Sequence, residues 1–189
     1  MNVYDFDETV FHPDSSFCFF CFCLRHRTLA VSKCIPASVL QFIIYLARGR
    51  QDAQKLKEAL FSYLNRIDNV ELLVQEFWAR SFDGISSWYL QQKQPDDVII
   101  SASPEFLLRP AADRLGVRLI ATPMNPYTGK IIGRNCHDHE KVRRFREQFP
   151  EATVDEFYSD SLSDTPLARL AVKAFLVKGN ERNTWPSGK

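Results

Sequence analysis

Short, compact runs of apolar residues, several of them β-branched, recur in the second half of the chain and predict buried strands. These runs cover residues 98–100, 117–121, 153–158 and 174–177, and a short hairpin strand is expected at 130–133. Helix-start signals and helical spacing lie between them and predict helices over residues 104–115, over 139–148 and from 165 onwards. Strands that alternate with helices imply an α/β fold in which a parallel sheet carries helices on both faces.

The start of the chain reads as a short strand followed by two carboxylates. Residues 2–4 and Phe6 suit a buried strand, and Asp5 and Asp7 flank Phe6. Because residues i and i+2 of a strand point to the same face, the two carboxylates would face one small volume. There they would repel each other and lose solvation, which a hard cation such as Mg²⁺ would relieve. The alternative interpretation is an acidic turn after a strand.

Between residues 11 and 94 the pattern becomes helical. The segment is dense in Phe, Leu, Ile, Ala, Gln and Lys, and no glycine lies between Glu8 and Gly49. Helices are expected over residues 17–24, 38–48, 56–67, 70–79 and 85–92, the last two separated by a turn at 82–84. We therefore predict a helical cap domain, residues 12–94, inserted into a core domain formed by residues 1–11 and 95–189.

Polar side chains follow three of the predicted strands, at the carboxyl ends where parallel sheets form their sites. They are Asp5 with Asp7, Ser101 with Ser103, and Asp160 with Asp164. Ser103 is also a candidate N-cap of the next helix. Lys141, at the start of another predicted helix, is the candidate cation. If the three strands are neighbours, all these groups line one pocket.

This set of groups suits phosphoryl transfer. Asp5 would be the nucleophile, and Asp7 would protonate the leaving alkoxide and then deprotonate the attacking water. Ser101 would donate its hydroxyl to a phosphate oxygen, beside backbone N–H groups such as that of Ala102. Lys141 would supply a positive charge for the same oxygens and restrain the Asp5 carboxylate.

The same carboxylates are candidate ligands for Mg²⁺, which prefers oxygen donors. Asp5, Asp160 and the backbone carbonyl of Asp7 would hold the ion. Asp164 would support the shell around it. The expected metal ligands are therefore Asp5, Asp7, Asp160 and Asp164.

These residues resemble the motifs of the haloacid dehalogenase-like superfamily of aspartate-nucleophile phosphatases, and the resemblance extends over the whole chain. The four motifs are residues 5–10 (D-F-D-E-T-V), 98–101 (V-I-I-S), 140–142 (E-K-V) and 159–164 (S-D-S-L-S-D). The resemblance implies a Rossmann-like three-layer sandwich, Mg²⁺ as cofactor and the roles given above for Asp5, Asp7, Ser101, Lys141 and Asp160. The helical insertion between the first two motifs resembles the phosphoserine phosphatase-like branch, in which a cap closes over the pocket and selects the leaving group.

Two departures from that branch bear on the substrate. The branch recognises the substrate amine with an acidic residue soon after the first motif, and Asp14 lies near that place with a shorter side chain. The glycine-rich stretch expected after the second motif is replaced by Ala102-Ser103-Pro104. Both differences argue against phosphoserine. We therefore expect a small phosphorylated metabolite as the substrate.

The apolar excess of the predicted cap has two interpretations. Residues 17–24 and 39–46 could be the buried core of the cap, which is the interpretation that we favour. Alternatively, they form an apolar surface for a lipid phosphate or a membrane. The chain would then be a lipid-phosphate phosphatase, like the phosphatidylglycerophosphatases of similar cap type in this superfamily, or a membrane-surface binding protein.

Composition narrows the remaining possibilities. The formal net charge of +1 over 189 residues gives no electrostatic reason to expect nucleic acid as a partner. The five cysteines are an odd number, so a disulfide framework is not expected, and Cys18, Cys21 and Cys23 are interpreted as buried thiols rather than a metal site. No secretory signal and no apolar run of ~20 residues is found, so we expect a cytoplasmic protein. The sequence gives no basis for predicting the oligomeric state.

Overall fold

The computed structural model describes residues 1–48 and 53–186 of the chain. Within them, one six-stranded sheet has the strand order β3-β2-β1-β4-β5-β6. Its strands are β1 (Val3–Tyr4), β2 (Val98–Pro104), β3 (Arg118–Thr122), β4 (Val154–Ser159), β5 (Ala171–Lys178) and β6 (Glu181–Thr184). Neighbouring strands are parallel except β5 and β6, which are antiparallel. The predicted α/β fold with a parallel sheet is confirmed.

Helices fill most of the connections between the strands in the described part of the chain. The α-helices are α1 (Ser15–His26), α2 (Thr28–Ser32), α3 (Ile35–Arg48), α4 (Ala53–Leu60), α5 (Val70–Ser81), α6 (Ser87–Gln92), α7 (Glu105–Leu115), α8 (His139–Gln148) and α9 (Thr165–Ala168). Short 3₁₀ helices are η2 (Phe61–Arg66), η3 (Phe82–Gly84) and η4 (Leu162–Asp164). None of the described helices combines the length and the apolar character that crossing a bilayer requires.

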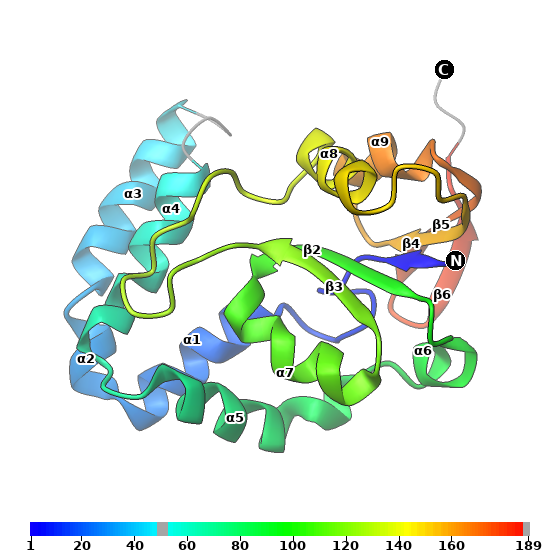
Figure 1. Cartoon of the computed structure of the whole chain (residues 1–189). Coiled ribbons are helices and arrows are strands. Elements are labelled where there is room, and N and C mark those ends of the chain that lie inside the picture. Colours follow the sequence, from blue (N-terminus) through cyan, green and yellow to red (C-terminus); the bar gives the residue numbers. More distant parts are fainter. Residues whose placement is uncertain (49–52, 187–189) are drawn as a thin grey trace.

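Helices cover both faces of the sheet, with α8 and α9 on one side and α7 on the other (Figure 1). Val98 and Ile100 of β2 pack in a buried cluster with Phe145 of α8. Ile99, which lies between them in sequence, packs in a second cluster with Leu107 of α7. This alternation is the two-residue period of a strand. A strand buried on both faces explains the continuous apolar run at residues 98–100.

The hydrophobic core on the α7 side continues into the helices that precede β2. Trp78 of α5 packs edge to face against Phe6 and Phe11, and its Nε1 donates to the carbonyl oxygen of Leu107 at 2.6 Å. Tyr89 of α6 is fully buried in the same cluster. Helices α5 and α6 thus share a core with the sheet, whereas α3 and α4 lie at the margin of the molecule (Figure 1). The proposed boundary between cap and core, at residues 12 and 94, stays a prediction.

Two predicted elements differ from the structure. The single helix expected at 56–67 is α4 followed by the 3₁₀ helix η2. A 3₁₀ turn places residues i and i+3 on one face, and Phe61 and Leu64 of η2 are both fully buried. The hairpin strand expected at 130–133 is reduced to a single bridge between Ile131 and Met124.

Burial of the apolar residues in the predicted cap also differs from the expectation. In α1, Phe19 and Cys23 are buried, but Cys21 is exposed and Cys18 only partly buried. In α3, large apolar side chains are exposed: Ile35, Val39, Leu40, Phe42, Ile43 and Leu46. The interpretation of residues 39–46 as the core of the cap was therefore wrong, as was the burial of all three thiols. The sequence pattern identified an apolar helix face but not what that face contacts.

Candidate active site

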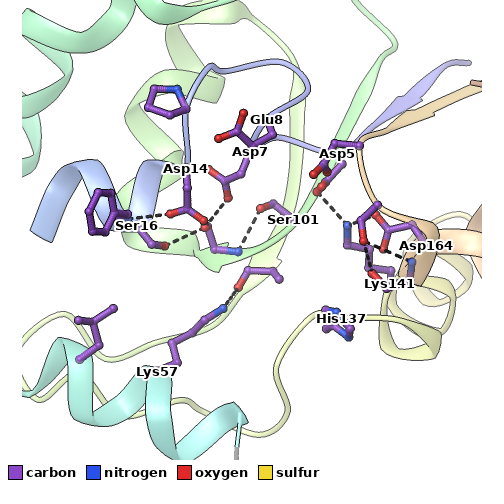
Figure 2. A pocket seen from close by; sticks show the side chains of 18 of the residues that line it. Asp5, Asp7, Glu8, Asp14, Ser16, Lys57, Ser101, His137, Lys141 and Asp164 are labelled. Carbon is purple, nitrogen blue, oxygen red and sulfur yellow. Dashed lines mark hydrogen bonds and ion pairs between the residues drawn. The ribbon is translucent and has the colours of Figure 1, made fainter. Parts of the chain in front are cut away.

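A pocket of about 610 Å³ lies where the carboxyl ends of the neighbouring strands β1, β2 and β4 meet (Figure 2). Its lining includes every site residue that the sequence selected: Asp5, Asp7, Asp14, Ser101, Ala102, Lys141, Asp160 and Asp164. Strand β1 lies between β2 and β4, so segments far apart in the sequence meet at this edge of the sheet. Helices α1 and α4 also contribute to the wall, through Phe17, Lys57 and Leu60 among others.

Lys141, near the start of α8, is buried between two carboxylates. Its Nζ donates to Asp5 Oδ1 at 2.8 Å and to Asp164 Oδ2 at 2.7 Å, and its side chain is 2% exposed. The hydroxyl of Ser159 donates to the same Asp164 oxygen at 2.8 Å. A buried ammonium is costly unless it is paired, and here two carboxylates pair with it. Lys141 therefore fixes the position of Asp5 relative to the end of β4.

Negative charge is in excess in this pocket. Burial raises the pKa of Asp5 to about 8, and the neighbouring Asp164 and Asp7 carboxylates add to the rise. Burial also raises the pKa of Asp7 and that of Asp160. Burial alone would lower the pKa of Lys141, but the charges of Asp5 and Asp164 raise it. The ammonium thus stays protonated, and the carboxylates outnumber it.

The donor atoms of the site fit a hard divalent cation such as Mg²⁺. The candidate ligands are all oxygens, and Oδ1 of Asp164 is buried without a hydrogen-bond partner. Asp160 is held in place because its backbone N–H donates to Thr9 Oγ1 at 3.0 Å. Within residues 1–48 and 53–186, no group of three or more His, Cys, Asp and Glu side chains is arranged to hold a metal by itself. Backbone carbonyls and waters would have to complete the shell, as Mg²⁺ sites commonly allow.

Asp7 is oriented by a hydroxyl of β2 and a backbone N–H of α1. The Ser103 hydroxyl donates to Asp7 Oδ2 at 2.6 Å, and the Ser15 backbone N–H donates to Asp7 Oδ1 at 2.6 Å. The hydroxyl of Ser16 lies 2.9 Å from that of Ser103. Ser103 was predicted to cap α7, which was wrong, because Pro104 occupies the N-cap and makes no side-chain cap bond. Its grouping with Ser101 at the end of a strand placed Ser103 in the pocket correctly, but its hydrogen bond to Asp7 was not predicted.

A lysine of the predicted cap also reaches the pocket. Lys57 of α4 donates through Nζ to the carbonyl oxygen of Ala102 at 2.8 Å and to Asn135 Oδ1 at 3.1 Å. Burial lowers the pKa of Lys57. On the same strand, Ser101 Oγ accepts a hydrogen bond from the Ser103 backbone N–H at 3.0 Å. Lys57 was missed because it occupies an ordinary position in an amphipathic helix.

Asp14 and His137 also line the pocket. Asp14 is the N-cap of α1, and its Oδ1 accepts from the Phe17 backbone N–H at 2.7 Å. His137, in the loop before α8, has an exposed side chain that also lines the pocket. Burial lowers the pKa of His137. The pocket therefore has an acidic end at Asp5 and a mixed wall of apolar and basic side chains (Figure 2).

Comparison with known sequences identifies similar proteins. A family model described as haloacid dehalogenase-like hydrolase matches residues 3–169 of the chain. Protein CicA of Caulobacter vibrioides, in each of two strains, is 28% identical over an alignment of 182 residues. The alignment covers 89% of this chain and 82% of that protein.

Solved structures share the fold at low sequence identity. A protein of unknown function from Bordetella pertussis Tohama I superposes with a TM-score of 0.77 at 22% identity, covering 93% of this chain and 88% of that one. A phosphoserine phosphohydrolase-like protein from Francisella tularensis gives a TM-score of 0.55 at 16% identity, covering 93% and 87%. A cytosolic 5'-nucleotidase IIIB bound to cytidine gives 0.67 at 12% identity, covering 93% and 72%. The Rossmann-like arrangement expected from the motifs is confirmed by these superpositions.

Proposed function

The chain belongs to the haloacid dehalogenase-like hydrolase family, and we propose that within this family it is a Mg²⁺-dependent phosphomonoesterase acting through a phosphorylated Asp5. One observation carries the proposal. A buried ammonium, Lys141 Nζ, bridges Asp5 and Asp164 at 2.8 and 2.7 Å in a pocket that also contains Asp7, Ser101 and Asp160. The groups proposed as nucleophile, acid, phosphate donor and oxygen ligands therefore line the same cavity, and phosphoryl transfer needs such a set.

In the first proposed step, an oxygen of the ionised Asp5 carboxylate, a form that a bound cation would favour over the protonated one, bonds to phosphorus while the bond from phosphorus to the alcohol oxygen breaks. Asp7 gives its proton to that departing oxygen. Burial raises the pKa of Asp7, so its carboxyl keeps a proton to higher pH than an exposed aspartate does. The hydroxyl of Ser103 and the N–H of Ser15 hold the carboxyl in one orientation during the transfer.

In the second step, a water attacks the phosphorus of phospho-Asp5 and Asp7 takes a proton from it. The bond between phosphorus and the Asp5 oxygen breaks, which releases inorganic phosphate and restores both carboxyl groups. Ser101 and Lys141 would bind the phosphate oxygens in both steps, together with the backbone N–H of Ala102. When Mg²⁺ is bound by Asp5, Asp160 and the carbonyl of Asp7, with Asp164 in support, it would neutralise charge on the phosphoryl group.

The proposed substrate is a small phosphorylated metabolite. A cavity of about 610 Å³ is in the range that ordinary small-molecule ligands fill. Asp14 stays the predicted contact to the leaving group, although one of its oxygens already accepts from the Phe17 N–H. All five cysteines are free, which fits the reducing cytoplasm as the proposed location.

The substitution Asp5→Asn tests the nucleophile. It keeps the shape of the side chain but removes the charge that attacks phosphorus, so kcat for p-nitrophenyl phosphate should fall at least about a thousandfold. The matched control is Asp113→Asn, because Asp113 is an exposed carboxylate of α7 outside the pocket. That variant should keep the wild-type rate. Rates are measured with Mg²⁺ and again after EDTA, over a panel of phosphorylated metabolites.

Two results would contradict the proposal. Asp5→Asn could hydrolyse p-nitrophenyl phosphate as fast as wild type, or wild type could show full turnover in EDTA. Circular dichroism of both variants shows whether a loss of rate reflects chemistry rather than unfolding. Acid quenching of wild type during turnover, followed by mass spectrometry, should find phosphate on the peptide that contains Asp5.

A further inference from the structure

Helix α3 presents apolar side chains to solvent along one face, which we call the α3 face. Its members are Ile35, Val39, Phe42, Ile43 and Leu46. They recur at intervals of three and four residues, so they share one side of the helix. Their exposed fractions run from 38% at Ile35 to 66% at Leu46. A contiguous apolar stripe of this kind marks an interaction site on a globular protein.

The opposite side of α3 carries polar groups toward the protein. Ser38 Oγ donates to the carbonyl oxygen of Ala59 in α4 at 3.1 Å, and also to that of Cys34 at 3.1 Å. Oε1 of Gln41 is buried and lacks a hydrogen-bond partner. A water-soluble helix normally buries its apolar side and exposes its polar side. In α3 apolar residues occupy much of the circumference: Leu40 is 57% exposed and Ile44 is half-buried, so the exposed stripe is not the side that packs on the protein.

The stretch of sequence that carries the α3 face is basic. Residues 15–48 contain four Lys and Arg and no Asp or Glu, whereas the rest of the chain holds 20 Lys and Arg against 23 Asp and Glu. Arg25, Arg27 and Lys33 are exposed. Lys33 precedes α3 and Arg48 is its last residue, so basic residues flank the apolar stripe at both ends in sequence. Basic residues around an apolar helix face are the pattern of helices that lie on anionic lipid.

The position of α3 leaves this face open. The helix lies at the outer margin of the molecule, away from the sheet, with α4 on its inner side (Figure 1). Helix α4 contributes Lys57 and Leu60 to the pocket wall. A partner surface that contacts α3 would therefore lie close to α4, which borders the pocket. It would not cover the sheet.

From these observations we propose that the α3 face docks on the surface of an anionic membrane. Phe42, Ile43 and their neighbours enter the boundary between headgroups and acyl chains, and the exposed basic residues Arg25, Arg27 and Lys33 add attraction to the headgroup phosphates. The stripe is too short for a span and lies in the plane of the interface. This docking does not depend on the proposed catalytic mechanism.

The test is co-sedimentation of the full chain with vesicles of phosphatidylcholine, with and without phosphatidylglycerol. Wild type should bind the vesicles that contain phosphatidylglycerol and should bind less as salt rises. The double variant Phe42→Ser with Ile43→Ser should lower the bound fraction at least about tenfold. The matched control is Leu72→Ser with Leu90→Ser, two exposed leucines of α5 and α6, which should bind like wild type.

Several results would overturn the docking proposal. Wild type could fail to bind anionic vesicles, or the Phe42/Ile43 variant could bind as well as wild type. Sedimentation velocity could find a wild-type dimer that the Phe42/Ile43 variant dissociates, which would assign the face to a second copy of the chain. Turnover of soluble p-nitrophenyl phosphate by that variant should equal wild type. A parallel loss of turnover would assign the face to the support of the pocket instead.

Discussion

At the scale of single residues, the pocket pairs its buried charges with specific donors. Lys141 contacts Asp5 and Asp164, and Asp7 accepts from Ser103 and from a backbone N–H. Each pairing restricts a carboxylate that would otherwise be mobile, and pre-oriented groups are what a positioning-dominated reaction requires. We therefore expect the hydroxyl of Ser103 to matter for the position of Asp7, although its hydrogen bonds go to Asp7 and to other serines.

The substitution Ser103→Ala should lower kcat about tenfold, because Asp7 loses the hydrogen bond that orients its Oδ2. That hydrogen bond favours the charged carboxylate and so lowers the pKa of Asp7. Its removal should raise that pKa further, and the alkaline limb of the rate profile should move to higher pH. Ser87→Ala, an exposed serine of α6, is the control. A fall in kcat with an unmoved pH profile would make Ser103 a merely structural residue.

Some site residues could be read from the sequence and others could not. Asp5 and Ser101 each end an apolar run, so strand geometry alone places them at the site edge. Lys57 has no such mark, since its role depends on where α4 lies in space. Its partners, Ala102 and Asn135, come from distant parts of the chain. The spacing of apolar residues within one helix cannot predict contacts between residues that are far apart in the sequence.

At the scale of elements, periodicity predicted which helices and strands form better than what covers them. Helices α3 and α5 both have apolar positions at helical spacing, yet Phe77 of α5 is buried and Phe42 of α3 is exposed. Strand β6 was not predicted, because all four of its residues, Glu181–Thr184, are exposed and carry no apolar alternation. It forms by pairing its backbone with β5. The environment of an element is a tertiary property that its own sequence does not contain.

The hydrogen bond from Trp78 to Leu107 joins α5 to α7, and its contribution can be isolated. Trp78→Phe removes the Nε1 donor, which lies 2.6 Å from the Leu107 carbonyl oxygen. Trp88→Phe is the matched control, because Trp88 is also buried but its Nε1 has no partner. Trp78→Phe should lower the free energy of unfolding by about 1–2 kcal/mol more than Trp88→Phe does, as measured by urea denaturation. Equal losses would mean that ring packing, and not the hydrogen bond, connects the two helices.

At the scale of the whole molecule, the order of the strands brings the proposed site residues together. Placing β1 between β2 and β4 gathers the acidic residues at one edge, at an electrostatic cost. That cost appears in the pKa values of Asp5, Asp7 and Asp160, all of which burial raises. The alternation of strands and helices was enough to predict the layers. The rise in the pKa values of these carboxyl groups could not be predicted from the sequence, because desolvation depends on what surrounds each carboxylate in space.

This cost predicts how the stability of the protein depends on pH and on Mg²⁺. A carboxyl group whose pKa is raised by folding favours the folded state while it is protonated. For Asp5 this contribution is complete below the unfolded pKa, roughly 4, and is lost as pH rises toward the folded pKa of about 8. Lys141, whose pKa is raised, contributes fully throughout this range and does not change the trend. Without Mg²⁺, this part of the stability should therefore decrease between about pH 5 and pH 8.

If Mg²⁺ binds at the proposed ligands, it competes with protons for the same carboxylates, so it should offset that loss, and more strongly at higher pH. For each proton that Mg²⁺ displaces, the affinity of the protein for Mg²⁺ should rise by up to about tenfold, or about 1.4 kcal/mol, per pH unit. The rise in thermal midpoint on adding Mg²⁺ should thus be larger near pH 8 than near pH 6. Asp5→Asn removes the charge of this carboxylate, so its midpoint should depend less on both pH and Mg²⁺. A Mg²⁺ effect of equal size at both pH values, or an undiminished one in Asp5→Asn, would mean that the ion binds outside the pocket.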